Sequence, residues 1–262
     1  MLVSCKQLLR GKPIKVKGIG TLVPPTLDSI FELSDNEENI DKYNLFINIL
    51  LIELPQFLEI AKLKAFYSQL PDEVQCQCSL FNLLLLKPDI RQTLFECLSF
   101  FIAEKIEYCD REYCFKVIDN KGQTIGVINN DNFESVRNNL LRLNCVNKKH
   151  EEKLKFKDEK ARQIYLRCQK GREEFQKAKP QNDKKYNLIN LVEYVATKSH
   201  SYNFFNIWDL TIYQFNVEFQ RINFYNQVDT YTKRWSTWGE DKFDFSVWYE
   251  NIEILNNGGK AE

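Results

Sequence analysis

The side chains that could carry out chemistry in this chain are two histidines and eight cysteines. His200 lies between Ser199 and Ser201, where an imidazole base could activate a serine, but no acid that would orient the imidazole is evident. A loop or helix-capping role is favoured for this serine-rich cluster. His150 lies in a strongly charged segment and is expected to be solvated. The histidines therefore indicate no catalytic site.

Four of the cysteines form two closely spaced pairs, Cys76/Cys78 and Cys109/Cys114, that could be combined into a four-thiolate zinc site. Zinc ligands usually occur two to four residues apart on tight turns, whereas Cys76 and Cys78 are separated by Gln77 alone. Buried reduced thiols are favoured. Cys109 and Cys114 flank a predicted turn, and the alternative is a thiol pair that faces across two strands. We expect no metal site.

Sequence motifs of the common enzyme classes are not found. The chain has no glycine-rich phosphate loop, no His-Glu-x-x-His pair and no Gly-x-Ser-x-Gly nucleophile turn, and Gly18-Ile-Gly20 lacks the third glycine of a dinucleotide site. We therefore expect no catalytic residues and no cofactor, and a scaffold or binding protein more than an enzyme.

The N-terminal sequence, the longest apolar run and the net charge argue against further classes of protein. The first residues lack the apolar core of a secretory signal, and the strongest apolar run, Leu45–Leu54, is about half the length of a membrane span and contains Asn48 and Glu53. A buried helix in a protein of the cytosol is favoured. Lys plus Arg and Asp plus Glu both total 36, so the zero net charge argues against a whole-chain polyanion binder.

Few glycines and prolines, nine and seven, indicate long helices and few tight turns. The pattern predicts a mainly α fold with a small central β-hairpin. Residues 1–105 are expected to form a helical, bundle-like domain. It opens with a short strand or hairpin around Ile14–Ile19 and a short helix after Pro25, and continues with helices after Asp41, over Gln56–Gln69, from Pro71 to Pro88 and over Asp89–Ala103.

Residues 106–147 are predicted to form a β-β-α unit. Glu107–Cys109 and Tyr113–Ile118 are strand candidates, Asp119–Gly122 is a turn signal and Thr124–Ile128 is the returning strand. A helix over about Asp131–Leu143 follows.

Residues 148–182 are predicted to be a charged helical connector. The stretch 148–185 contains 14 Lys or Arg and 7 Asp or Glu, a local charge of +7. It could bind RNA or DNA, but its acidic residues and few aromatic rings favour a solvated helix or an acidic protein partner. Nucleic acid is therefore the less favoured partner.

Residues 183–255 are predicted to form an aromatic-rich helical domain, followed by a disordered tail at 256–262. Residues 202–249 hold 16 of the 35 aromatic residues, including all four tryptophans. A helix over about Phe205–Tyr225 would carry an apolar stripe with steps of three and four residues, typical of a helix packed along another helix. Our candidate partner-binding residues are Phe205, Trp208, Ile212, Phe215, Phe219, Trp235, Trp238 and Trp248.

Several stretches resemble proteins of the tail module of phages that infect Gram-positive bacteria. They are Leu8–Ile14, Gly20–Ile30, Ile125–Phe133, Phe205–Phe215 and the pair Trp248-Tyr249. The resemblance implies a tail assembly chaperone, or a minor tail or baseplate component, and it implies no catalytic residues. The expected partners are the tape-measure protein or other tail proteins, or a second copy of the chain, with no membrane.

Three hypotheses follow. The first is a chaperone that binds and shields the tape-measure protein in the host cytoplasm and is absent from the finished particle. The second is a structural tail or baseplate subunit of the virion, and the third is a nucleic-acid-associated protein that uses residues 148–185.

Overall fold

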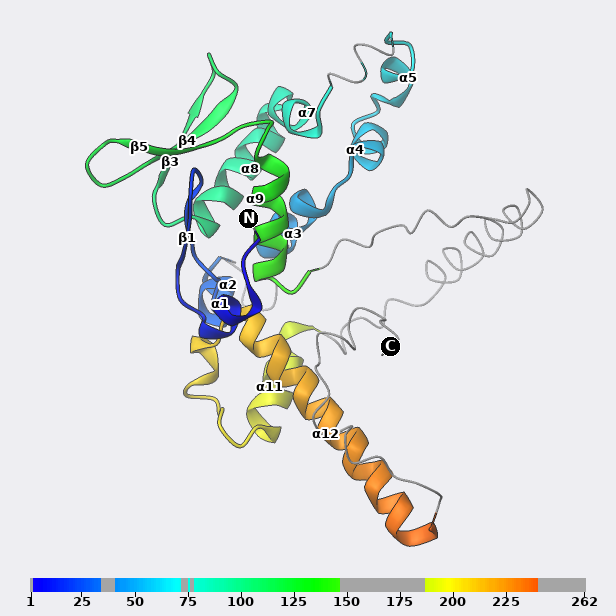
Figure 1. Ribbon diagram of the computed structural model, residues 1–262. Helices are drawn as coiled ribbons and strands as arrows, with labels where there is room; N and C mark the ends of the chain where they lie inside the picture. The colour runs from blue at the N-terminus through cyan, green and yellow to red at the C-terminus, as the bar shows by residue number, and fades with distance from the viewer. Residues whose placement is uncertain (1, 34–40, 72–74, 76–77, 147–186, 240–262) are drawn as a thin grey trace, which may run out of the picture.

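The structure, a computed structural model, describes residues 2–33, 41–71, 75, 78–146 and 187–239. It confirms a mainly α fold with a small β component (Figure 1). The predicted connector at 148–182 and the tail at 256–262 lie outside the described residues. The described elements, in chain order, are α1 (Cys5–Arg10), β1 (Ile14–Val16), β2 (Gly20–Leu22), α2 (Leu27–Glu32), α3 (Asp41–Leu51), α4 (Leu54–Ile60), α5 (Lys64–Tyr67), α7 (Leu80–Leu86), α8 (Pro88–Phe101), β3 (Lys105–Cys109), β4 (Cys114–Ile118), β5 (Thr124–Ile128), α9 (Phe133–Leu143), α11 (Leu188–Lys198), the 3-10 helix η2 (Ile207–Asp209) and α12 (Ile212–Trp238).

The N-terminal hairpin and the short helix after it are confirmed. Strands β1 and β2 pair antiparallel, with Ile14 opposite Leu22. The hydroxyl of Thr26 caps α2 by accepting from the backbone N–H of Ser29. A helix that we did not predict, α1, precedes the hairpin and begins at a capping box between Ser4 and Gln7.

Two helix predictions in the N-terminal part are wrong in extent. The predicted helix over Gln56–Gln69 is divided into α4 and α5, because Lys62 adopts a left-handed backbone conformation (φ 57°) that an α-helix cannot contain. Leu80–Leu86 is a separate helix and not the second half of one that starts at Pro71, because Ser79 is extended and caps α7 through the N–H of Asn82.

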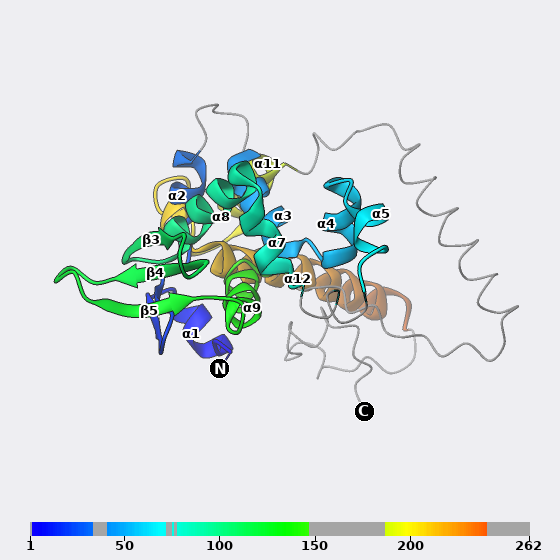
Figure 2. The same ribbon diagram turned by 90° about the horizontal axis from the view of Figure 1, so that it is seen from above.

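The central unit has three strands and one helix. Strands β3, β4 and β5 form an antiparallel sheet in that order, and α9 follows as predicted. Helices α3, α8 and α9 pack together beside this sheet, and Figure 2 shows the sheet and the α4–α5 pair at opposite ends of the body.

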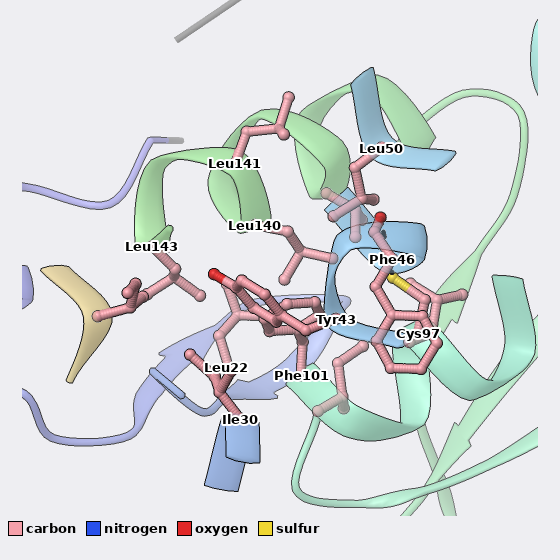
Figure 3. Packing of buried hydrophobic residues seen from close by; sticks show 14 of the residues in the cluster. Leu22, Ile30, Tyr43, Phe46, Leu50, Cys97, Phe101, Leu140, Leu141 and Leu143 are labelled. Atoms are coloured by element: carbon pink, nitrogen blue, oxygen red, sulfur yellow. Dashed lines mark hydrogen bonds between the residues drawn. The ribbon is translucent and has the colours of Figure 1, made fainter. Parts of the chain in front are cut away.

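One hydrophobic cluster joins the N-terminal, central and C-terminal parts of the chain, from Val3 to Ile222. Figure 3 shows how residues of β2, α2, α3, α8 and α9 converge in its centre. Because these elements share a core, none of them buries its apolar face alone. Nothing in the arrangement tests the predicted domain boundaries, which stay predictions.

Three polar side chains of α9 and the residue after it are buried in this core with hydrogen bonds. Arg137 donates to the carbonyl of Leu50 (2.7 Å) and forms ion pairs with Glu53 (2.8 Å) and Glu134 (3.3 Å). Asn139 accepts from the N–H of Val3, and Asn144 accepts from the hydroxyl of Tyr43 (2.7 Å). A buried polar group is tolerated when its hydrogen bonds are satisfied, so these bonds fix α9 against α3 and the N-terminus.

The N-terminal hairpin touches the central sheet at two glycines. The backbone N–H of Val127 donates to the carbonyl of Gly18 (3.1 Å), and Gly18 bridges to Gly126. A Cβ atom at Gly126 would lie 2.8 Å from the carbonyl oxygen of Gly18. Backbone cannot yield as a flexible side chain does, so this approach requires glycine at position 126.

We predict that Gly126→Ala lowers the free energy of unfolding by about 2–3 kcal/mol, because the added methyl group overpacks two backbone segments. Gly122→Ala is the matched control: position 122 has open space around it but a φ of 77°, so only backbone strain is introduced, about 1 kcal/mol. Urea unfolding of both variants measures the difference. An equal loss in the two would contradict the close approach.

We also predict a loss of stability at alkaline pH that depends on Tyr43. Burial, with Cys145 as a second cause, raises the pKa of Tyr43 above its ordinary value. The unfolded chain therefore releases this proton near pH ~10 while the folded chain keeps it, so the free energy of unfolding falls as pH rises above ~10. Tyr43→Phe should reduce this fall and cost about 1–2 kcal/mol at pH 7, because Asn144 loses its donor.

The measurement is urea unfolding between pH 7 and 11. Tyr231→Phe is the control, because this side chain is exposed and its variant should keep the pH dependence of the original chain. A Tyr43→Phe variant with an unchanged pH dependence would refute the assignment. Cys97 and Cys114, whose pKa values burial also raises, contribute to the part of the fall that remains.

Candidate protein-binding helix

The C-terminal helix α12 begins at a sharply defined cap. Thr211 is extended, its hydroxyl accepts from the N–H of Gln214, and the Gln214 side chain accepts from the N–H of Thr211 (3.0 Å). This reciprocal capping box fixes the first turn of the helix. The helix therefore starts at Ile212.

The base of α12 is bound to the N-terminal part of the chain. The N–H of Leu27 donates to the carbonyl of Leu210, and the N–H of Ile212 donates to the carbonyl of Pro25, both at 2.9 Å. The Gln214 amide also donates to the carbonyl of Leu9 (2.9 Å). We call residues 24–31 together with 207–214 the base junction.

Helix α11, which we did not predict as a separate element, packs along the first half of α12. The Tyr194 ring meets the Phe219 ring edge-on at 5.9 Å, and the Tyr194 hydroxyl donates to Asn223 (3.1 Å). Ser199, which ends α11, donates to Glu218 (2.7 Å). These contacts reach only as far as the middle of α12, and Figure 1 shows the remainder extending away from the body.

The structure divides the eight candidate residues into four groups. The helix predicted over Phe205–Tyr225 in fact runs from Ile212 to Trp238, so Phe205 and Trp208 precede it. Phe205 is 95% exposed, while Trp208 is half-buried with its ring 5.5 Å from the ring of Phe31. Along α12, Ile212 and Phe215 are buried in the core, Phe219 is half-buried, and Trp235 and Trp238 are exposed. Trp248 lies outside the described residues.

Two apolar stripes run along α12, one after the other. The proximal stripe contains Ile212, Phe215, Phe219 and Ile222, which face the core or α11. The distal stripe contains Phe224, Val228, Tyr231, Trp235 and Trp238, again with steps of four and three residues.

The two stripes point in nearly opposite directions. Phe224 follows Ile222 by two residues, and two residues turn an α-helix by about 200°. Residues of the distal stripe therefore lie on the side of the helix that faces away from the body's core. Sequence analysis identified Trp235 and Trp238 but missed Phe224, Val228 and Tyr231; the step pattern after Ile222 was the signal that could have found them.

The exposed rings of this helix are large. Tyr231 is 57% exposed, Trp235 38% and Trp238 71%, and Tyr225 beside the stripe is 45% exposed. The guanidinium of Arg221 lies 5.8 Å from the centre of the Tyr225 ring, a distance at which a cation and an aromatic face attract. The exposed rings of Tyr231, Trp235 and Trp238 on one side of the helix form a candidate interaction surface.

The cysteine pair and the cluster around His200, which the sequence singled out for possible chemistry, take part in the fold. Cys109 and Cys114 are directly opposite each other in the β3–β4 pairing, as the turn between them suggested, and both are free thiols. Burial raises the pKa of Cys114, which disfavours its reactive thiolate. Ser199, next to His200, accepts from the N–H groups of Ser201 and Tyr202 in the loop after α11, which is the loop role expected for this cluster.

Among the residues that the structure describes, no group of three or more His, Cys, Asp or Glu side chains is placed to hold a metal ion. None of the helices described there combines the length and hydrophobicity needed to cross a membrane.

Comparisons with known proteins found one family. Residues 177–253 match the model of the YomV second domain, a phage-derived family. The match covers less than a third of the chain and includes all of α11 and α12. It suggests that this is a phage protein. No curated protein and no solved structure matches the chain.

We predict that a substitution in the proximal stripe destabilises the fold, whereas a substitution at the end of the distal stripe does not. Phe215→Ala should lower the free energy of unfolding by about 3–5 kcal/mol, because it leaves a cavity in the core. Trp238→Ala should change it by less than about 0.5 kcal/mol. Urea unfolding followed by circular dichroism measures both. A large loss for Trp238→Ala would make the distal stripe part of the folded core.

Proposed function

We propose that the chain is a non-enzymatic phage tail assembly protein that binds and shields the tape-measure protein in the host cytoplasm. The observation that carries the proposal is the outer part of the distal stripe, where the rings of Tyr231, Trp235 and Trp238 are exposed on a projecting helix. This helix lies within the part of the chain that matches a phage-derived family. The tail-module resemblance of Phe205–Phe215 supplies the tail context.

The shape of the stripe favours a helical partner. Its residues follow one another by four and three positions, so they form a seam that is complementary to an equivalent seam on a second helix. A tape-measure protein is a very long helix with apolar faces that would aggregate if left uncovered. Helix-on-helix packing with large aromatic anchors could cover such a face during assembly.

The rigid base junction supports a binding role as well. Because the capping box and the backbone bonds to Pro25 and Leu27 fix the first turn, the distal stripe is presented by a helix whose direction is set by the body. A preorganised helix loses less conformational entropy on binding than a loop would.

A structural role in the tail or baseplate is the alternative, since the same stripe could pack permanently against a neighbouring subunit of the virion. The two roles differ in whether the protein remains in the particle. Mass spectrometry of purified virions decides between them: we expect no peptides of this chain, and peptides at a fixed copy number would replace the chaperone by a structural subunit.

We predict that Trp235→Ala combined with Trp238→Ala weakens capture of the co-expressed tape-measure protein at least tenfold, because a few large aromatic side chains, tryptophan above all, carry most of the binding energy of an interface. Phe205→Ala is the matched control: the ring is 95% exposed but lies before α12, away from the stripe. Affinity co-purification measures both.

Equal capture by the double variant and the original chain would refute the role of the stripe. Capture lost in the Phe205→Ala control as well would place the interface elsewhere. Circular dichroism of each variant verifies that the fold is retained.

A further inference from the structure

Strands β3 and β4 bring two thiols directly opposite each other. Their pairing runs over five consecutive residues of each strand and ends at Cys109 opposite Cys114, the last pair before the turn. In antiparallel strands, opposite Cα atoms are about 4.5 or 5.5 Å apart, depending on whether the two residues share hydrogen bonds. Both separations fall within the range of roughly 4.4–6.8 Å that a disulfide bridges between two Cα atoms. The backbone register therefore meets the distance requirement for a bond between Cys109 and Cys114.

The register at this point is held on both sides. The preceding pair in the two strands, Tyr108 and Phe115, packs ring against ring at 5.3 Å, and Phe115 is fully buried. In the turn, Asp110 forms an ion pair with Arg91 of α8 (3.6 Å). Since adjacent residues of a strand point to opposite faces, the two cysteines share the face away from the buried rings. Any slippage that separated the two thiols would also break this ring pair.

The two thiols differ in access and surroundings. Cys109 is half-buried, whereas Cys114 is only 2% exposed. The Sγ atom of Cys114 donates to a carboxylate oxygen of Glu112 (3.7 Å). Burial first, and then the negative charges of Glu112 and Cys109, raise the pKa of Cys114. The Lys116 ammonium opposes this shift. An external reagent therefore reaches Cys109 first, and the second thiol lies beside it.

We propose that Cys109 and Cys114 form a reversible redox site, which a low-molecular-weight disulfide such as oxidised glutathione converts into a cross-strand disulfide. The Cys109 thiolate attacks the S–S bond of the reagent, forms a mixed disulfide and releases one thiolate. Cys114 then loses its proton, and its sulfur attacks the Cys109 sulfur and expels the second thiolate. Two cysteine thiols are oxidised, the reagent is reduced to two thiols, and the two cysteine protons end on those thiols.

The site lies outside α12 and does not depend on the proposed function. A reducing cytosol keeps such a pair as two thiols, and disulfides that do form there are usually transient and redox-sensing. The bond closes the turn between β3 and β4 when the glutathione pool becomes oxidising, and it opens again when the pool is reduced.

The sequence provides a direct test, because trypsin cuts between the two cysteines. Cleavage after Arg111 leaves Cys109 in peptide 106–111 and Cys114 in peptide 112–116. The full-length chain is equilibrated with oxidised glutathione, quenched, alkylated, digested and analysed by mass spectrometry. We expect the two peptides to be joined to each other, with every other link to either cysteine at least about tenfold rarer. Separate alkylated peptides, or a link from Cys109 to another cysteine or a second chain, would overturn the proposal.

Closeness in sequence could also join the two cysteines in an unfolded chain, so the contribution of the fold is measured separately. The equilibrium between the two thiols and the disulfide is determined in glutathione buffers with and without denaturing urea. We expect the disulfide to be favoured at least about tenfold more in the folded chain, because paired strands raise the effective concentration of one thiol at the other. Equal equilibrium constants would overturn the assignment of the site to the strand pairing.

Two variants test the order of the steps. In Cys114→Ser, we expect the mixed disulfide with glutathione to accumulate on Cys109, because no thiol remains to expel it. In Cys109→Ser, Cys114 should take up glutathione at least about tenfold more slowly, because its sulfur is buried. Equal uptake in the two variants would refute Cys109 as the attacking thiol. Cys78→Ser removes a half-buried thiol outside the sheet and is the matched control, which should keep the link between the two peptides. Loss of the link in this control would overturn the proposal.

Discussion

The base junction is the constraint on which the arrangement of the C-terminal part depends. Two backbone hydrogen bonds, between Leu27 and Leu210 and between Ile212 and Pro25, connect segments that are far apart in the sequence. The capping box of Thr211 lies between these bonds, so the same few residues both start α12 and attach it to the body. With its first turn held on both sides, a helix of 27 residues must continue beyond the surface of the body.

The body that provides this attachment is itself fixed by polar contacts inside an apolar core. Arg137 binds the carbonyl of Leu50 at the end of α3 and pairs with Glu53 at the start of α4. Satisfying the last carbonyls of a helix with a buried guanidinium is favourable only when the geometry is well defined, because an unpaired charge in the core is costly. Placements of α9, α3 and α4 that separate Arg137 from Leu50 and Glu53 are therefore disfavoured, because they leave a buried charge unpaired.

The sequence predicted local structure where local signals were strong. The strands of the central sheet follow from alternation around Asp119–Gly122, and α9 follows from its apolar face. The predicted start of the C-terminal helix was wrong because a cap interrupts the apolar spacing. The spacing of Trp208, Ile212 and Phe215 continues across Thr211, but Thr211 is extended and caps the helix, so Trp208 lies outside it. Periodicity also does not say what a stripe packs against, so the burial of Phe215 and the exposure of Trp238 had to come from the fold.

The reversal of the apolar face within α12 lets one helix both attach to the body and present the surface to which we assign partner binding. If both stripes lay on one side, the helix would lie along the body and bury every ring against the same core. A change of about 200° between Ile222 and Phe224 means that the residues anchoring the helix cannot be covered by the same surface as those beyond them. The rings of Tyr231, Trp235 and Trp238 therefore lie outside the core and are exposed. Since the two stripes share no residue, substitutions in the exposed part of the distal stripe leave the core contacts of the proximal stripe unchanged.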